Sequence, residues 1–138
     1  MRQRASLRNR GGSGGSVALS VEGRMTFFQG VPTLRDLQRA VGGYVEAVRF
    51  SLAGSEATMF VNEEGKLCAE PERNWKADTI CPLAWGDWTA GDVVFTGGVG
   101  RRGETLALTD AQMAELKRID RNVCVLLIDE SAVGVVSG

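Results

Sequence analysis

Histidine is absent from the 138 residues of this chain. Without an imidazole, the protein cannot build a Ser-His or Cys-His nucleophile, and it lacks the commonest general acid–base group and the commonest transition-metal ligand. The sequence contains no cofactor-binding motif either. Because these absences exclude much of enzyme chemistry, we expect a protein that is not an enzyme and that holds no cofactor.

Cysteine is scarce as well. The chain has three, Cys68, Cys81 and Cys124, and no Cys-x-x-Cys pair. An odd number without close pairs fits neither a disulfide framework nor a zinc site, which takes four nitrogen or sulfur ligands at short spacings. We therefore expect reduced, mostly buried thiols and no metal site.

Long apolar runs are also missing. No run approaches the roughly 18 to 20 residues that span a bilayer, and the N-terminus has no apolar signal segment. We expect a cytoplasmic protein that does not bind membranes.

The composition, 43% hydrophobic and 24% charged, is typical of a globular domain, and the net charge of −1 argues against attraction of the whole chain to nucleic acid.

The first 16 residues contain arginine, glycine and serine but no acidic residue. We interpret residues 1–16 as a flexible basic arm and residues 17–138 as a single domain. The arm is either an extension without a role, such as translated sequence upstream of a start at Met25, or it binds nucleic-acid phosphates through Arg2, Arg4, Arg8 and Arg10. Removing these four of the 16 basic residues leaves 12 against 17 acidic ones, a net charge of −5 that is unsuited to general DNA binding.

Apolar periodicity predicts a small sheet and two helices. Thr33 with Asp36, and Thr109 with Gln112, have the spacing of helix N-caps with a reciprocal partner, so a helix is expected after each threonine. The middle of the chain, 70–91, is predicted to be irregular, with at most one turn of helix. Strands are predicted over 16–21, 24–30, 44–50, 57–62, 92–98 and 122–129. The expected fold class is α+β, with a mostly antiparallel sheet and two short helices packed on it.

The segment VNEEGKL, residues 61–67, has the composition of a hairpin tip. It would join the strand at 57–62 to one at 66–70, although 57–62 could instead pair with 44–50. Two adjacent carboxylates, Glu63 and Glu64, raise the possibility of a catalytic pair. Adjacent acids, however, point to opposite faces of a strand or are both solvated at a turn.

Other carboxylates offer a weaker basis for chemistry. Asp87 and Asp92 are a second candidate pair. A carboxylate-based enzyme would require Glu46, Glu63, Glu64 or Asp92 to meet in one pocket. We favour solvated acids, which make Glu63 and Glu64 a charged recognition surface.

Two further segments suggest binding. The glycines of TGGVGRRG, residues 96–103, could direct backbone N–H groups at an anion beside Arg101 and Arg102, although the P-loop spacing is absent. Three tryptophans lie in the irregular middle of the chain, and such rings either anchor a partner or fold back over the sheet as a satellite core. The candidate partner-binding residues are therefore Glu63, Glu64, Trp75, Trp85 and Trp88.

Several motifs resemble one family of small domains. The segments LQRAVGGYVEAV, VNEEGKL, NWKA, AGDVVFTG and LALTDAQ occur here in the same order as in the domain of unknown function three-eight-four-six (DUF3846). The resemblance covers residues 25–120. It implies a compact α+β module of phages, plasmids and other mobile elements, and it carries no catalytic residue.

Three hypotheses follow from these observations. The first is a small interaction or regulatory protein that binds an unidentified protein partner through the tryptophan-bearing loop and the neighbouring acidic turn. The alternative is a nucleic-acid or nucleotide-binding accessory protein that uses the basic arm and the loop with Arg101 and Arg102. The third is a carboxylate-based enzyme.

Overall fold

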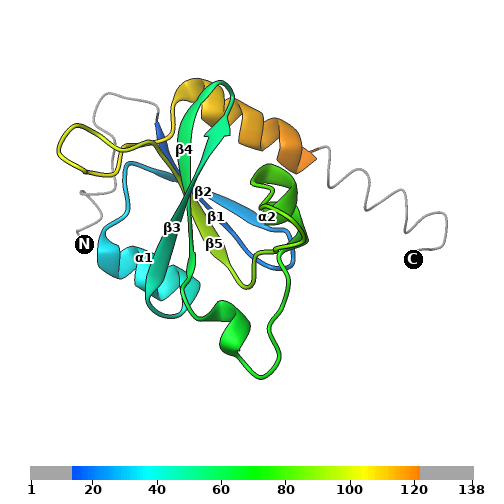
Figure 1. Cartoon of the computed structure of the whole chain (residues 1–138). Coiled ribbons are helices and arrows are strands. Elements are labelled where there is room, and N and C mark those ends of the chain that lie inside the picture. The colour runs from blue at the N-terminus through cyan, green and yellow to red at the C-terminus, as the bar shows by residue number, and fades with distance from the viewer. Residues whose placement is uncertain (1–13, 122–138) are drawn as a thin grey trace.

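A computed structural model of the chain describes residues 14–121, and its centre is a five-stranded antiparallel sheet (Figure 1). The strands run in the order β2-β1-β5-β4-β3. Their bounds are Gly15–Leu19 for β1, Met25–Gln29 for β2, Val45–Leu52 for β3, Ser55–Asn62 for β4 and Val93–Gly97 for β5. The predicted fold class, α+β with a mostly antiparallel sheet, is confirmed.

The central strand is β5, and it joins two hairpins. On one side it pairs with β1, which forms a hairpin with β2, and on the other it pairs with β4, which forms a hairpin with β3. All five residues of β5 are buried. The prediction of a covered apolar strand at 92–98 is therefore confirmed.

Helices lie on both faces of the sheet. On one face, α1 (Leu34–Val41) contacts β3, β4 and β5; on the other lie α2 (Trp75–Ile80) and a helix over residues 110–121 (Figure 1). Both predicted N-caps are confirmed. Thr33 and Asp36 exchange side chain to backbone bonds of 3.1 and 3.0 Å, and Thr109 and Gln112 do so at 3.1 and 2.9 Å.

The main core lies between the sheet and the second pair of helices. It combines side chains of four strands with those of α2, the loop after it and the 110–121 helix, and its largest members are Phe95, Leu19, Met59, Leu108 and Leu116. Lys76 of α2 is buried beside this core, where its Nζ donates to the carbonyl of Gly23 and to Asp120. These bonds fix α2 against the β1–β2 turn and the 110–121 helix.

The predicted hairpin tip at VNEEGKL is wrong. β4 pairs with β3 through a turn at Ala53 and Gly54, which have φ values of 51° and 85°. After Asn62 the chain enters the 3-10 helix η2 (Gly65–Leu67), so the strand considered at 66–70 does not form. The cause is Asn62, whose amide donates to the carbonyl of Val41 at 3.1 Å while its oxygen accepts from the N–H of Glu64 at 2.8 Å.

Some predictions concern residues outside the described range. The four arginines of the arm, Cys124 and the strand predicted at 122–129 all belong to this group. β1 begins at Gly15, so the boundary that we set at residue 16 lies inside this strand. Within residues 14–121, Cys81 is buried but Cys68 is exposed, so the prediction of buried thiols is wrong for Cys68. None of the helices in this range has the length and apolar character needed to cross a membrane.

Candidate functional site

The three tryptophans lie in the long connection between β4 and β5. Trp75 is 66% exposed, Trp85 is 98% exposed and Trp88 is half-buried. The alternative in which the rings fold back over the sheet as a satellite core is therefore wrong for Trp75 and Trp85. Trp85 has a φ of 38°, a left-handed conformation that is uncommon for a bulky residue, and Gly86 follows it at 75°. This turn projects the Trp85 ring into solvent.

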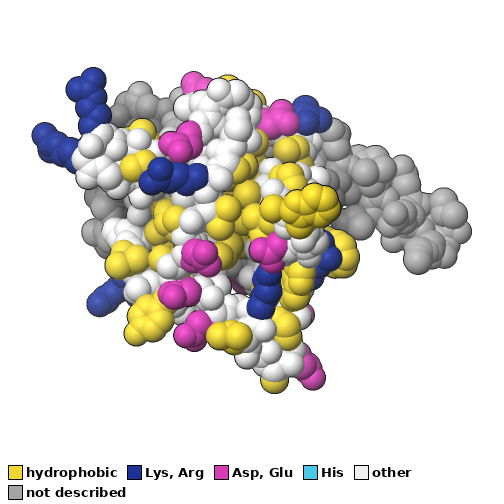
Figure 2. Space-filling view, viewed as in Figure 1, with side chains coloured by type: hydrophobic (Ala, Val, Ile, Leu, Met, Phe, Trp, Pro, Cys, Tyr) yellow, Lys and Arg dark blue, Asp and Glu magenta, His cyan; other side chains and the backbone are white. Residues whose placement is uncertain are grey.

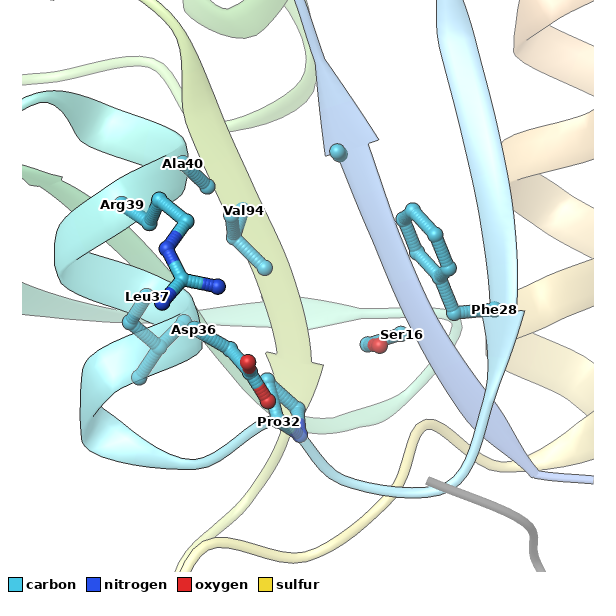
Figure 3. A pocket seen from close by; sticks show the side chains of 9 residues that line it. Ser16, Phe28, Pro32, Asp36, Leu37, Arg39, Ala40 and Val94 are labelled. Atoms are coloured by element: carbon cyan, nitrogen blue, oxygen red, sulfur yellow. The ribbon is translucent and has the colours of Figure 1, made fainter. Parts of the chain in front are cut away.

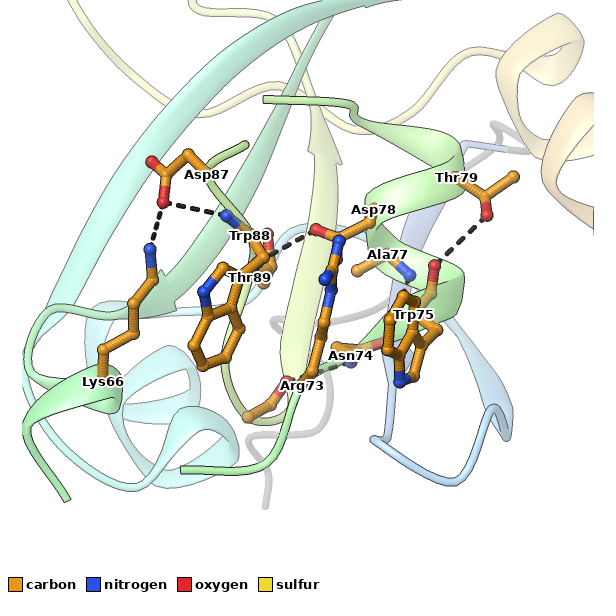
Figure 4. A network of polar contacts seen from close by, with 11 residues as sticks. Lys66, Arg73, Asn74, Trp75, Ala77, Asp78, Thr79, Asp87, Trp88 and Thr89 are labelled. Atoms are coloured by element: carbon orange, nitrogen blue, oxygen red, sulfur yellow. Dashed lines mark hydrogen bonds and ion pairs between the residues drawn. The ribbon is translucent and has the colours of Figure 1, made fainter. Parts of the chain in front are cut away.

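Two cations alternate with two tryptophan rings in a stack that we call the cation–tryptophan ladder (Figure 4). The guanidinium carbon of Arg73 lies 3.9 Å from the centroid of the Trp75 ring and 5.9 Å from that of Trp88. The Nζ atom of Lys66 lies 5.0 Å from the Trp88 centroid, on the side away from Arg73 (Figure 4). Each such contact contributes about 0.5–1 kcal/mol at an exposed site. The ladder therefore restricts the motion of both rings.

Asp78 anchors the ladder to the fold. Its Oδ2 accepts from Arg73 Nε at 2.7 Å, and its Oδ1 accepts from the backbone N–H of Thr89 at 2.9 Å. Sequence reasoning selected the tryptophans but missed Arg73, Lys66 and Asp78. The signal that could have identified them is the occurrence of basic and acidic residues close to the tryptophans in a segment without helical or strand periodicity.

Asn74 positions the helix that carries Trp75. Its side chain is fully buried, and its oxygen accepts from the N–H of Ala77 at 3.0 Å as the N-cap of α2. Its amide donates to the carbonyls of Leu19 at 3.2 Å and Gly91 at 2.9 Å. One side chain thus joins the start of α2 to β1 and to the segment before β5.

A groove of about 410 Å³ runs beside the ladder, between the sheet and the tryptophan-bearing loop. Its apolar lining is Val48, Met59, Val61, Leu67, Leu83 and Ala90, and its charged lining is Glu46, Glu63, Lys66 and Asp87, with Trp88 on the loop side. Apart from Leu67, which is 80% exposed, the apolar members are buried or half-buried, whereas the charged members are exposed. The groove therefore has an apolar floor and a charged rim. Figure 2 shows acidic and hydrophobic side chains intermixed on the face that carries β3.

The charges of the groove are not balanced. Asp87 contacts Lys66 and accepts from the N–H of Trp88 at 2.8 Å, and these bonds, led by the one from Lys66, lower the pKa of Asp87 below its ordinary 3.8. Within residues 14–121, neither Glu46 nor Glu63 has an ion-pair partner. The groove therefore carries uncompensated negative charge.

The structure separates the members of each candidate pair, although it brings Glu46, Glu63 and Asp87 to the same groove. Glu63 lines the groove, whereas Glu64 lines a neighbouring hollow with Tyr44 and Cys68. Asp87 is bound to Lys66, and Asp92 instead accepts from the N–H of Val21 at 3.0 Å. No group of three potential metal ligands occurs in the described part of the chain.

The glycine-rich loop is filled by its own side chain. The carboxylate of Glu104 accepts from the N–H of Arg102 at 2.9 Å, and a Cβ added to Gly100 would lie 2.2 Å from a Glu104 oxygen. Arg101 and Arg102 are exposed at the turn. The backbone position in which an external anion would bind is therefore already occupied by a carboxylate.

A second hollow of about 270 Å³ lies on the opposite face, beside α1 (Figure 3). Its walls are mainly apolar: Leu37 and Ala40 of α1 face Phe28 of β2 across Val94 of β5. None of the residues proposed from the sequence lines it. Of the five predicted partner-binding residues, Glu63 and Trp88 line the groove, Glu64 lines the neighbouring hollow, and Trp75 and Trp85 lie on the tryptophan-bearing loop.

Comparison with known proteins gives one match. The model of a family described as a domain of unknown function (DUF3846) matches residues 18–120. No curated protein and no solved structure matches the chain.

Proposed function

The chain belongs to the DUF3846 family, and we propose that it is a small, non-enzymatic interaction protein that binds a protein partner through the groove and the tryptophan-bearing loop. The setting that the family resemblance implies is a phage, plasmid or other mobile element. We further propose a regulatory role in the cytoplasm. The observation that carries this proposal is Trp85, which is 98% exposed at a left-handed turn beside the groove.

Tryptophan is the residue type most enriched among interface residues that dominate binding energy. Its large surface is unfavourable in water, and it loses little conformational entropy when it is bound because only two torsions are fixed. Trp88 and Trp75 are already restricted by Arg73 and Lys66. Rings that are ordered in advance reduce the entropic penalty of association.

The test is affinity capture with the full chain from extracts of cells that carry the mobile element, followed by measurement of affinity for the captured protein. We expect Trp85→Ala to weaken binding by about 2 kcal/mol, or roughly thirtyfold. The same change should alter the free energy of unfolding by less than about 0.5 kcal/mol, since the ring contacts little of the fold.

A matched control is Leu34→Ala. Leu34 is 61% exposed on α1, on the other side of the sheet, and its removal should leave binding unchanged. Equal affinity of the wild-type protein and of a Trp85→Ala, Trp88→Ala double variant would refute the proposed surface.

A further inference from the structure

We propose that the partner presents an extended segment with alternating basic and apolar side chains, which adds as a strand to the free edge of β3 and places those side chains in the groove. This inference rests on the proposed function, because it specifies the ligand of the same surface. Three features of the described residues carry it: the edge of β3, the position of the groove along that edge, and the uncompensated charge.

The first feature is the outer edge of β3. The carbonyl of Tyr44 accepts from Glu63 at 2.8 Å, and the register Val45↔Asn62 follows. Because hydrogen-bonded pairs alternate in an antiparallel ladder, the residues that direct N–H and C=O groups away from β4 are Val45, Ala47, Arg49 and Ser51. No described residue forms a hydrogen bond with these outer backbone groups. The edge is therefore free along most of an eight-residue strand.

The second feature is the position of the groove. Glu46 and Val48 belong to β3 and also line the groove, so its open side follows this edge. Side chains of a strand alternate between faces with a period of two. An added strand would therefore present every second side chain to the groove, while its backbone completes the ladder of β3.

The third feature is charge. Glu46 and Glu63 are unpaired on the groove, whereas the one cation that lines it, Lys66, is bound to Asp87. Arg49, the other charged residue of β3, lies 3.8 Å from Glu56 on β4. A basic side chain would therefore meet two free carboxylates, and the apolar floor would accommodate the next side chain on the same face.

Charge on an edge strand also protects it against aggregation. That role accounts for Glu46, but it does not account for Glu63, which follows β4 and faces the same groove. The other edge strand, β2, has five residues, and Lys117 lies 5.5 Å from its Phe27 ring. The longer edge, with the groove and the unpaired acids beside it, is therefore the docking site.

The test uses a defined probe, the nonapeptide TKTVTKTVT, which alternates lysine and valine on one face. Backbone amide shifts of the full chain are followed by NMR as the peptide is added to about 1 mM. We expect the shifts to change most at the outer residues of β3 and at the groove. Replacing the lysines of the peptide by glutamate, or making the Glu46→Gln, Glu63→Gln double variant, should weaken binding by about tenfold or more.

The backbone contribution is tested separately. Ala47→Pro removes an N–H that points away from β4, where proline is compatible with an edge strand, so the fold should survive while binding is lost. N-methylation of one alternate set of peptide residues should abolish binding, and N-methylation of the other set should not. Equal tolerance of both sets, or no binding by the wild-type chain, would overturn the inference. So would a dimer in solution that Ala47→Pro dissociates, since a second copy would then occupy the edge.

The two proposals can fail independently. Partner capture that depends on Trp85 but is unchanged by Ala47→Pro would retain the proposed function and reject strand addition. Peptide binding at β3, combined with capture that does not depend on Trp85 or Trp88, would reject the tryptophan surface instead.

Discussion

Replacing Asn74 by alanine should destabilise the protein far more than the loss of an ordinary helix cap. Removing the cap of α2 costs about 1 kcal/mol. The carbonyls of Leu19 and Gly91 would also lose the amide donors that now lie at 3.2 and 2.9 Å, in a site with no exposure. Each lost bond contributes about 1 kcal/mol, so we expect a total near 3 kcal/mol.

The assay is guanidinium unfolding followed by circular dichroism, and the control is Thr33→Ala. Thr33 caps α1 with the same kind of bond, 3.1 Å to the N–H of Asp36, but it is exposed, and among the described residues its side chain forms no hydrogen bond with a distant segment. Its removal should cost about 1 kcal/mol. If Asn74→Ala costs no more than Thr33→Ala, the buried amide does not hold α2 on the sheet and the reasoning fails.

Asn74→Asp tests separately the two functions of the side chain, because it retains the capping oxygen but removes the amide donors. A carboxylate keeps the bond to Ala77 but turns an oxygen toward two carbonyl oxygens, which favours its protonated form and raises its folded-state pKa above the unfolded value of about 3.9. A raised folded-state pKa adds stability below the unfolded pKa, and this stability is lost as pH rises through the folded pKa. The loss in free energy of unfolding relative to the wild-type protein should therefore be smallest below about pH 4 and should grow toward neutrality. A loss that is independent of pH would contradict this account.

Three further predictions concern single sites. Ala53→Asn should raise the free energy of unfolding by about 0.5–1 kcal/mol, because asparagine tolerates the φ of 51° better than alanine. The guanidinium midpoint should rise accordingly, and an unchanged midpoint would contradict this prediction. Lys66→Gln should raise the pKa of Asp87 toward 3.8 in a carboxyl NMR titration, and the stabilisation from this pair is present above the unfolded pKa and lost as pH falls through the lowered one. Burial raises the pKa of Cys81 to about 11, so iodoacetamide near pH 8.5 should alkylate exposed Cys68 and spare Cys81, as peptide mass spectrometry would show.

Local signals predicted the regular elements well. The helices after Thr33 and Thr109 follow from capping residues that act within one turn, and the buried strand at 92–98 follows from an unbroken apolar run. Such signals depend only on neighbours in sequence, so the sequence contains all that they require. The α+β class follows from their order.

The failure at VNEEGKL has a different cause. Asparagine, acids and glycine are equally compatible with a hairpin turn and with an Asx turn into a 3-10 helix. The choice is made by the bond from Asn62 to the carbonyl of Val41, which is distant in sequence. That contact exists only after α1 has packed on the sheet.

The candidate site was predicted in part. Glu63 and Trp88 do line one groove, as expected for an acidic turn beside a tryptophan-bearing loop, and Trp85 is exposed. The involvement of Arg73 could not be derived from the sequence, and Glu46 was considered only as part of a carboxylate-based enzyme. Both depend on tertiary placement, the first on stacking between two rings and the second on a strand edge that meets the loop.

The position of β5 bears on the order in which the sheet can assemble. The β1–β2 and β3–β4 hairpins form from residues that are close in sequence. Within the described sheet the two hairpins do not pair with each other; β5, the last of the five strands in sequence, pairs with β1 on one side and with β4 on the other. Its pairing of Phe95 with Val17 closes one of the longest loops in the chain, a step that limits the rate of folding in sheets of high contact order. A chain cut before Val93 would contain two hairpins with no strand to join them. During synthesis, therefore, the tryptophan-bearing loop is complete before the sheet that orients it.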